Sequence, residues 1–347
     1  MAEILDRLIK IGIEKTIPLS GLIELTNKCN EQCIHCYRVL TKRKELTYEI
    51  LQSLFDELLS LSTFFLTFSG GELFLHKDVL KILEYAKKLR FYVIIKTNGL
   101  LLDKQKILFL KDIGINRIDF SLYAIDSSVH DSITKKEGSY EKTLWSIKEC
   151  KKEGLRVRIN VPVLKHNKEE IENLIGFAEK TGIEKTFDPF ISPRLDGNRQ
   201  PLLYRLQPSE IKKVIEKLKN FENNREEIEG KIDTKEEELL NSIPCSAGFS
   251  QFYINSYGDV TPCVAFPYVC GNIFTQSFTS IWYKSQGFEK VRGVRIRDLP
   301  VCSSCKFFDV CNRCPGNAYI ETGDFKNNSP SSCEYAFNGL NGGDYLE

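Results

Sequence analysis

The chain has 347 residues, of which 42% are hydrophobic and 27% are charged. These proportions are typical of folded globular proteins, and they exclude the disordered, collagen-like and coiled-coil classes. The length allows one large domain with a smaller one beside it. The 48 basic and 47 acidic residues leave a net charge of +1. Because so small a charge creates no field that collects polyanions, we expect no nucleic-acid partner.

The beginning of the chain, MAEILDRLIKIGIEKT, mixes acidic with basic side chains and contains no long apolar run. It therefore does not have the features of a secretory signal, and we expect a cytoplasmic protein. The most apolar stretch, residues 58–68, reads LLSLSTFFLTF. This stretch is too short and too rich in hydroxyl groups to cross about 30 Å of hydrocarbon, so no membrane segment is predicted.

Short runs of β-branched and aromatic residues alternate with helical patterns between residues 20 and 190. This alternation is typical of repeated βα units and of a parallel sheet. We predict six strands, at residues 21–27, 63–69, 91–97, 116–123, 155–164 and 184–190. Six such units form an open, partial (β/α)6 barrel of the TIM type, which we assign to residues 1–195.

The helix predicted to begin near Thr47 shows how the barrel helices are built. Thr47 is expected to cap this helix, and Glu49 lies in its first turn. Apolar side chains then recur at helical spacing. We expect one face to pack on the sheet through Ile50, Leu51, Leu54, Phe55, Leu58 and Leu59.

The second half of the chain changes in composition. Residues 191–206 contain Pro, Gly, Asn and Asp without periodicity, which indicates a connection. Residues 208–240 are rich in Lys and Glu and begin with Pro208, a favourable first residue of a helix, so we predict a solvated helix or loop. We therefore assign residues 196–244 to a linker with helical content. Residues 245–347 are predicted to form a small cysteine-rich domain held together by metal.

The distribution of the 12 cysteines is the most informative feature of the sequence. One, Cys150, stands alone in a helical pattern with Leu144 and Ile147, where we expect a core position. The others gather in two groups. They are Cys29, Cys33 and Cys36 near the beginning, and Cys245, Cys263, Cys270, Cys302, Cys305, Cys311, Cys314 and Cys333 near the end. Because disulfides are rare in a reducing compartment, such groups indicate metal sites.

The first group lies on a loop that directly follows the first predicted strand. Folds with parallel strands place their sites at the carboxyl ends of those strands. A four-iron cluster normally takes four cysteines, so the three thiolates of Cys29, Cys33 and Cys36 would leave one iron open to a small molecule. A zinc ion with His35 as its fourth ligand is the alternative, although His35 directly precedes Cys36 and fits a tetrahedral site poorly.

A C-x3-C-x2-C loop after the first strand of a partial barrel resembles that of the radical S-adenosylmethionine (SAM) enzymes. The resemblance implies a 4Fe-4S cluster on Cys29, Cys33 and Cys36, with the open iron chelated by the amine and carboxylate of SAM. It also implies reductive cleavage of SAM to a 5'-deoxyadenosyl radical that abstracts hydrogen from the substrate. The family usually has an aromatic residue against the adenine just before the third cysteine, and His35 takes that place here.

Further motifs of the family end the next predicted strands. Ser69-Gly70-Gly71-Glu72 corresponds to a Gly-Gly-Glu segment that lies against the amino group of SAM, where glycines allow close approach and a carboxylate suits an ammonium. The family often continues with Pro, whereas this chain has Leu73. Thr97-Asn98-Gly99 and Ser121 end the third and fourth strands. Over residues 20–190 the resemblance thus implies SAM contacts from His35, Gly70, Gly71, Glu72, Thr97, Asn98 and Ser121.

The second group contains the run Cys302-x2-Cys305-x5-Cys311-x2-Cys314. Cysteine pairs two residues apart are typical of metal loops, and two zinc ions on eight thiolates are one interpretation. The segment is also similar to the SPASM extension of peptide-modifying radical enzymes, although that family has three residues between the last two cysteines. The resemblance implies an outer auxiliary iron–sulfur cluster on Cys302, Cys305, Cys311 and Cys333, and an inner one on Cys245, Cys263 and Cys314. Cys270 is the candidate fourth ligand of the inner cluster, with an ordinary buried thiol as the alternative.

Other polar residues carry weaker signals. His76, His130 and His166 are isolated, and we expect structural or surface roles for them. Glu24 and Asp188 lie on predicted strands and are candidates for proton exchange with the substrate in the barrel interior, with an ordinary polar position as the alternative. The sequence assigns no catalytic acid or base.

The resemblance implies an enzyme that modifies a peptide side chain, in a ribosomally synthesised precursor, by cross-linking, epimerisation or another change. A peptide or protein substrate and an electron donor such as flavodoxin or ferredoxin are the implied partners, with the auxiliary clusters relaying or accepting electrons. Because about 20 residues precede the first strand, we expect leader recognition by a separate protein or by the SPASM surface. The alternatives are an anaerobic sulfatase maturase, a tetrapyrrole side-chain enzyme, and a zinc-stabilised interaction protein without catalysis.

Overall fold

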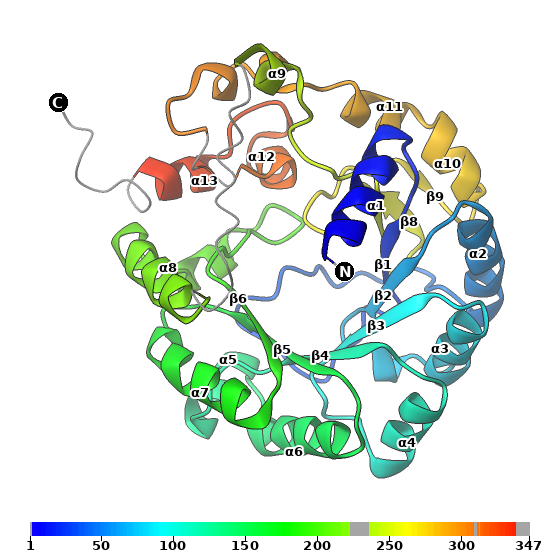
Figure 1. Ribbon diagram of the computed structural model, residues 1–347, viewed down its shortest axis with the longest axis vertical. Helices are drawn as coiled ribbons and strands as arrows, with labels where there is room; N and C mark the ends of the chain where they lie inside the picture. The colour runs from blue at the N-terminus through cyan, green and yellow to red at the C-terminus, as the bar shows by residue number, and fades with distance from the viewer. Residues whose placement is uncertain (1, 223–235, 309–310, 312, 338–347) are drawn as a thin grey trace.

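A single nine-stranded sheet runs through the computed structural model, which describes residues 2–222, 236–308, 311 and 313–337. The strand order is β6-β5-β4-β3-β2-β1-β7-β8-β9. The strands from β6 to β7 pair in parallel, and β8 and β9 are antiparallel additions. Figure 1 shows β1 to β6 as an arc with helices α2 to α7 outside it. The arc is open, so the predicted partial α/β barrel is confirmed.

Each of the six predicted strands is present, with ends that differ from the prediction by up to three residues. The strands are β1 (Ser20–Glu24), β2 (Phe65–Ser69), β3 (Tyr92–Thr97), β4 (Arg117–Ser121), β5 (Val157–Pro162) and β6 (Glu184–Asp188). Most of the difference lies at the carboxyl ends of β1, β4, β5 and β6, where the prediction ran on past the last paired residue. There the chain leaves the hydrogen-bonded ladder while its residue types remain those of a strand.

The helices outside the arc follow chain order: α2 (Tyr48–Ser60), α3 (Val79–Lys88), α4 (Lys104–Asp112), α5 (Ser127–Thr134), α6 (Ser139–Lys152) and α7 (Ile171–Thr181). Helix α1 (Ala2–Glu14) precedes β1, and α8 (Pro208–Glu222) and α9 (Glu236–Asn241) follow β6 in the chain. The C-terminal segment contributes β7 (Gln251–Ile254), β8 (Asp259–Thr261), β9 (Gly271–Asn272), α10 (Phe278–Lys284), α11 (Gln286–Arg292), α12 (Pro315–Thr322) and α13 (Pro330–Tyr335). Five short 3-10 helices link them: η1 (Leu73–Leu75), η2 (Lys168–Glu170), η3 (Gln200–Tyr204), η4 (Ile296–Asp298) and η5 (Cys302–Ser304).

Helix α2 confirms most of its predicted packed face and corrects two details. Leu51, Leu54, Phe55 and Leu58 are buried, whereas the side chain of Leu59 is 47% exposed. Leu59 lies about 90° from the centre of the buried stripe at 100° per residue, so it falls at the margin of the stripe. Thr47 occupies the N-cap position but makes no side-chain hydrogen bond to the helix.

The C-terminal segment shares the core of the barrel. Strand β7, which the sequence analysis did not predict, pairs in parallel with β1, with Leu22 opposite Tyr253. Behind this pair, Trp282 of α10 is fully buried within the main hydrophobic cluster, and its indole N–H donates a 2.8 Å hydrogen bond to the carbonyl oxygen of Thr16. Residues more than 230 positions apart are therefore held in one packed unit.

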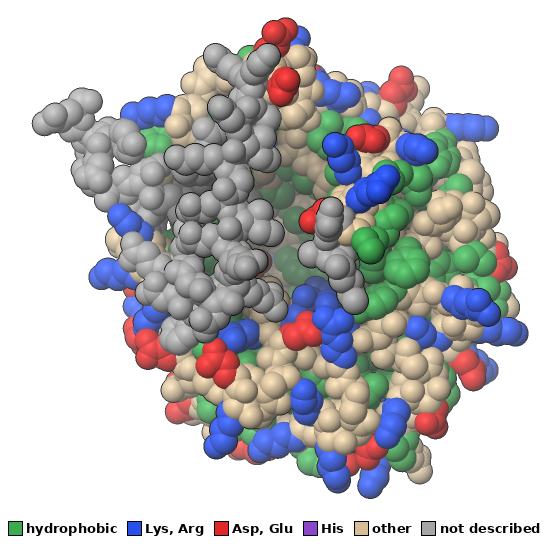
Figure 2. Space-filling view, viewed as in Figure 1, with side chains coloured by type: hydrophobic (Ala, Val, Ile, Leu, Met, Phe, Trp, Pro, Cys, Tyr) green, Lys and Arg blue, Asp and Glu red, His purple; other side chains and the backbone are tan. Residues whose placement is uncertain are grey.

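Figure 2 shows one face of the molecule, on which hydrophobic side chains gather along α1. Four apolar side chains of α1 are at least 40% exposed: Ile4, Leu5, Leu8 and Ile9. Among the described residues, no helix combines the length and the apolar character needed to cross a bilayer.

Packing between β1 and β7 can be tested at Gly21. A Cβ added to Gly21 would lie 2.2 Å from the ring of Phe252, which is buried against Phe278. Gly21→Ala should therefore lower the free energy of unfolding by about 1–3 kcal/mol through overpacking. Urea unfolding followed by circular dichroism measures the change.

Gly176 of α7 supplies the matched control, because a Cβ added there meets no atom within 4 Å. Gly176→Ala should leave the stability unchanged or raise it by up to about 1 kcal/mol through helix propensity. Equal stabilities of the two variants would contradict the described packing of β1 on β7.

Candidate active site

Cys29, Cys33 and Cys36 lie on the loop that leaves the carboxyl end of β1, and all three are free, partly exposed thiols. The loop is fixed against the end of α5, since the N–H groups of Gln32 and Ile34 donate to the carbonyl oxygens of Thr134 and Ile133 at 3.0 Å. Burial raises the pKa of the Cys33 thiol, and the nearby Cys36 and Cys29 raise it further. Cysteine thiolates are ligands for a cationic metal centre, which stabilises the thiolate form.

The spacing of these groups bears on the kind of centre. Within the described residues, no three His, Cys, Asp or Glu side chains converge closely enough to hold a single metal ion. A zinc ion needs its ligands at about 2.0–2.3 Å from one point. An iron–sulfur cluster gives each thiolate its own iron and so accepts a wider arrangement. A set of three cysteines fits an iron–sulfur cluster that leaves one iron open.

Glu72 ties the ends of β2 and β3 together. Its buried carboxylate accepts hydrogen bonds from the hydroxyl of Thr97 at 2.8 Å and from the backbone N–H of Asn98 at 2.9 Å. Burial raises the pKa of this carboxyl to about 7. The side chain of Asn98 then donates to Asn30 Oδ1 at 2.8 Å. One hydrogen-bonded network thus joins two strand ends to the cysteine loop.

Gly70 and Gly71 bring two backbones into contact. A Cβ added to Gly71 would lie 1.9 Å from the carbonyl oxygen of Lys28, and Gly70 has a φ of 148° with the carbonyl oxygen of Thr26 2.5 Å from an added Cβ. The N–H of Gly71 donates to Thr26, and that of Glu72 to Lys28, both at 2.8 Å. A side chain at either glycine would separate the two strand ends.

His35 and Tyr123 form the opposite side of the cysteine loop. Their rings meet edge to face with centroids 5.0 Å apart, and the Tyr123 hydroxyl lies 3.9 Å from Cys33 Sγ. Burial lowers the pKa of His35 to about 4, and its Nδ1 has no hydrogen-bond partner among the described residues. Ser121 is the last residue of β4 and is half-buried. The predicted SAM contacts of these residues remain predictions.

Two cavities open beside the loop, toward the barrel interior and the C-terminal segment. One, of about 190 Å³, is lined by His35, Tyr37 and Asp188 among others. The second, of about 260 Å³, is lined by Glu24 and Arg38 among others. Leu195 and Val264 line both cavities, so the two are neighbours.

The two acidic residues considered from the sequence both face these cavities. Glu24 is buried and accepts a 3.0 Å hydrogen bond from the Tyr37 hydroxyl, and burial raises its pKa. Asp188 accepts the N–H of Phe190 at 2.9 Å, and burial raises its pKa as well. Each carboxyl belongs to a residue that lines one of the cavities, and neither is assigned a catalytic role.

Seven of the remaining cysteines influence one another's pKa within two sets. Burial raises the pKa of the Cys263 thiol, and Cys314 and Cys245 raise it further, to about 11. Cys333, Cys302 and Cys305 do the same for Cys311, whose pKa is also about 11. Mutual influence of this kind requires proximity. The assignment of each set to a cluster stays a prediction.

The pKa of Cys270 is shifted by burial and by Arg292, whereas the thiols within each of the two sets above influence one another. It is buried in the main hydrophobic cluster, its Sγ lies 3.5 Å from the carbonyl oxygen of Tyr268, and it packs on Gly287. Burial raises its pKa to about 12, and Arg292 is the one charged group described as opposing that rise. Cys150 is likewise fully buried, on α6.

His76 and His130 are buried, and their ring nitrogens bond the carbonyl oxygen of Leu46 and the backbone N–H of Tyr123. His166 is exposed and lies beside Tyr204. The sequence analysis missed Tyr37, Arg38 and Tyr123, which contact the cysteine loop or its neighbours. For Tyr37 and Arg38, the only signal in the sequence was their position as the two residues after Cys36.

Comparison with known families identifies the two parts of this site. Residues 23–178 match the radical SAM superfamily, and residues 245–315 match the iron–sulfur cluster-binding domain called SPASM. The chain is a radical SAM enzyme with a SPASM domain. Such an enzyme uses SAM and a 4Fe-4S cluster, and its SPASM domain holds auxiliary iron–sulfur clusters. A zinc-stabilised protein without catalysis is thereby set aside.

Relatives of this radical SAM enzyme carry different names. It is 27% identical to an AdoMet-dependent heme synthase of Methanosarcina barkeri over 88% of this chain and 94% of that protein. It is 28% identical to AlbA of Bacillus subtilis, an antilisterial bacteriocin subtilosin biosynthesis protein, over 87% of this chain and 68% of that one. The crystal structure of Streptococcus suis SuiB bound to its precursor peptide SuiA superposes with a TM-score of 0.73 at 20% identity, covering 94% of this chain and 79% of that one. The last comparison supports the fold.

The place of Cys270 can be tested by metal analysis. If Cys270 is the fourth ligand of the inner cluster, Cys270→Ala should lower the iron content of the anaerobically reconstituted protein, as Cys245→Ala should. The structure leads us to expect a smaller loss for Cys270→Ala, because this side chain is buried in the main hydrophobic cluster. Cys150→Ala is the control and should keep all of the iron. Equal iron losses for Cys270→Ala and Cys245→Ala would contradict this expectation.

Proposed function

We propose that this enzyme modifies a side chain of a peptide, in a ribosomally synthesised precursor. The neighbouring cavities of about 190 and 260 Å³ carry this proposal. Each has the size of one or two side chains, whereas compact small-molecule ligands use pockets of about 300–1,000 Å³. An extended peptide presents alternate side chains to neighbouring pockets, which suits this arrangement.

The names of relatives support the same substrate class. AlbA acts in the biosynthesis of a bacteriocin, and SuiB has been crystallised with a precursor peptide. The similarity to a heme synthase, which spans 94% of that protein, keeps a tetrapyrrole as the second candidate substrate.

Within this proposal, Cys29, Cys33 and Cys36 hold the SAM-binding cluster, and the two C-terminal cysteine sets hold the auxiliary clusters. Once bound, the cluster and SAM supply one electron and a carbon-centred radical that removes a hydrogen atom from the substrate. Glu72, Thr97 and Asn98 hold the strand ends that face SAM. The half-buried side chains that line the two cavities exclude water and orient the peptide. Domain limits of 1–195, 196–244 and 245–347, a cytoplasmic location, and a flavodoxin or ferredoxin donor belong to the same proposal.

The direct test uses short peptides encoded beside the gene. We expect the reduced enzyme, given SAM, to change the mass of one such peptide or to introduce solvent deuterium into it. Loss of two hydrogens would indicate a cross-link, and deuterium at an α-carbon would indicate epimerisation. Mass spectrometry reads both outcomes. Turnover of a haem-precursor tetrapyrrole with no change in any peptide would contradict the proposal.

Leu195 allows a structural test, since it lines both cavities. Leu195→Trp should fill the junction between them and lower peptide turnover at least tenfold, with the iron content unchanged. Leu203, whose side chain is 67% exposed, gives the matched control, Leu203→Trp, which should turn over the peptide normally. Full activity of Leu195→Trp would show that the peptide binds elsewhere.

A further inference from the structure

Arg38 directly follows the cysteine loop, and its guanidinium turns back onto the beginning of that loop. Its Nη1 donates to the carbonyl oxygen of Asn27 at 2.9 Å and to Asn27 Oδ1 at 3.1 Å. The same nitrogen lies 2.7 Å from the position of a Cβ added to Gly71. The guanidinium therefore fills the space between the start of the cysteine loop and the Gly-Gly-Glu segment.

The groups around this guanidinium are anionic or become so. Cys36, Glu24 and Cys29 each favour its charged form, and burial opposes them without preventing a raised pKa. Burial raises the pKa of Cys29 and of Glu72, and the charge of Arg38 offsets part of that rise. A guanidinium stays protonated throughout the ordinary pH range, so it is a permanent cation at this place.

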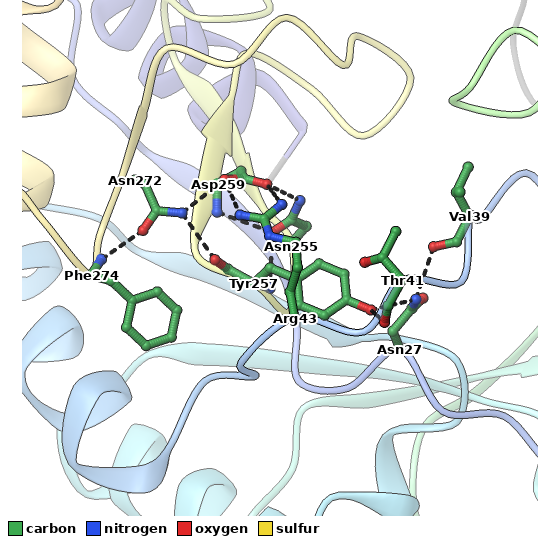
Figure 3. Close-up of polar contacts among 9 residues, drawn as sticks. All are labelled: Asn27, Val39, Thr41, Arg43, Asn255, Tyr257, Asp259, Asn272 and Phe274. Atoms are coloured by element: carbon green, nitrogen blue, oxygen red, sulfur yellow. Dashed lines mark hydrogen bonds and ion pairs between the residues drawn. The ribbon is translucent and has the colours of Figure 1, made fainter.

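Asn27, which accepts the hydrogen bonds of Arg38, is held in turn by Tyr257 and Thr41. We call these three residues the clamp. Figure 3 shows Asn27 between the loop and the C-terminal segment. The side-chain amide of Asn27 donates to the Tyr257 hydroxyl at 2.7 Å, and that hydroxyl donates to the carbonyl oxygen of Thr41 at 2.6 Å. With both amide hydrogens used, the second on the carbonyl oxygen of Val39, the Asn27 oxygen is left to face Arg38.

An ion pair between Arg43 and Asp259 also joins the segment after the cysteine loop to the C-terminal segment. Arg43 Nη2 donates to Asp259 Oδ1 at 2.8 Å, its other terminal nitrogen bonds the second carboxylate oxygen, and its guanidinium lies 5.0 Å from the centre of the Tyr257 ring. Asn255 and Asn272 also donate to Asp259. The C-terminal segment thereby fixes residues 38–43, which carry Arg38.

We propose that Arg38 is a positioning residue that holds a permanent positive charge beside the cluster of Cys29, Cys33 and Cys36 and raises the reduction potential of that cluster, and that Tyr257 keeps this charge in place through Asn27. Adding an electron makes the cluster more negative, so a fixed cation stabilises the reduced form more than the oxidised form. Because the site is half-buried, solvent ions screen this attraction only in part.

The test is a potentiometric titration of the full-length, anaerobically reconstituted enzyme, followed by electron paramagnetic resonance. The Cys29→Ala, Cys33→Ala, Cys36→Ala triple variant supplies the signals of the auxiliary clusters for subtraction. At the midpoint potential of the unaltered enzyme, Arg38→Gln should lower the ratio of reduced to oxidised cluster at least about threefold. Arg38→Lys keeps the charge and should recover most of that loss.

Arg156 provides the control for removal of a positive charge. Its side chain is 55% exposed and pairs with Glu184 at the other end of the strands, so Arg156→Gln should leave the ratio unchanged. Tyr257→Phe releases Asn27 and should shift the ratio in the same direction as Arg38→Gln, but by less. An unchanged ratio in Arg38→Gln with a full iron content would overturn the proposal, and an unchanged ratio in Tyr257→Phe would overturn the part played by the clamp.

Should Arg38→Gln fail to retain its cluster, Asn27→Asp carries the test. This substitution has almost the same size and places a carboxylate directly on the Arg38 guanidinium, which offsets its charge in place. We expect the ratio of reduced to oxidised cluster to fall at least about threefold here as well. A ratio equal to that of the unaltered enzyme would overturn the proposal.

Discussion

The active site depends on backbone contact between the ends of β1 and β2. Hydrogen bonds from Gly71 and Glu72 to Thr26 and Lys28 hold the Gly-Gly-Glu segment directly against the start of the cysteine loop. An added Cβ at Gly71 would lie only 1.9 Å from a carbonyl oxygen, so this contact requires glycine. The carboxyl ends of parallel strands lie at the same edge of a sheet. The hydrogen bonds between the ends of β1 and β2 join the cysteine loop and the Gly-Gly-Glu segment at that edge.

Glu72 extends the surface to a third strand. A buried carboxylate normally costs free energy, and here that cost is offset by hydrogen bonds from Thr97 and Asn98. A carboxyl with a pKa raised to about 7 gains further from a positively charged neighbour. In the proposed SAM contact of Glu72, the ammonium of SAM would be such a neighbour.

The open barrel explains why the C-terminal segment is integral to the fold. An exposed edge of β1 would be a ready template for pairing with other chains, and β7 occupies it. The same segment brings Tyr257 and Asp259 onto the loop that follows the cysteines. Auxiliary clusters and the SAM-binding cluster are thereby carried by one packed unit, which suits electron transfer between them.

Much of this organisation could be predicted from sequence, for identifiable physical reasons. The six barrel strands carry strong apolar runs, so they were found. The packed face of α2 was predicted except at Leu59, which lies at the margin of the stripe. Strand β7 was missed because its four residues, QFYI, are too few for a periodic pattern.

Contacts between distant residues could not be predicted in the same way. Nothing local to Arg38 shows that its guanidinium turns back to Asn27, and nothing near Asn27 indicates a tyrosine 230 positions later. The contact of Tyr123 with Cys33 also arises from tertiary packing. The sequence analysis named Cys270 as the candidate fourth ligand of the inner cluster, with a buried thiol as the alternative, and the structure surrounds it with core side chains.

Cleavage of SAM at the three-thiolate loop is the property on which all other chemistry of the enzyme depends. The most direct measurement is the formation of 5'-deoxyadenosine by the anaerobically reconstituted protein with a strong reductant, followed by liquid chromatography and mass spectrometry. We expect steady formation of deoxyadenosine by the unaltered protein and none by the Cys29→Ala, Cys33→Ala, Cys36→Ala variant, which should keep its auxiliary iron. Equal formation by both proteins, or none by either with all clusters present, would contradict the account.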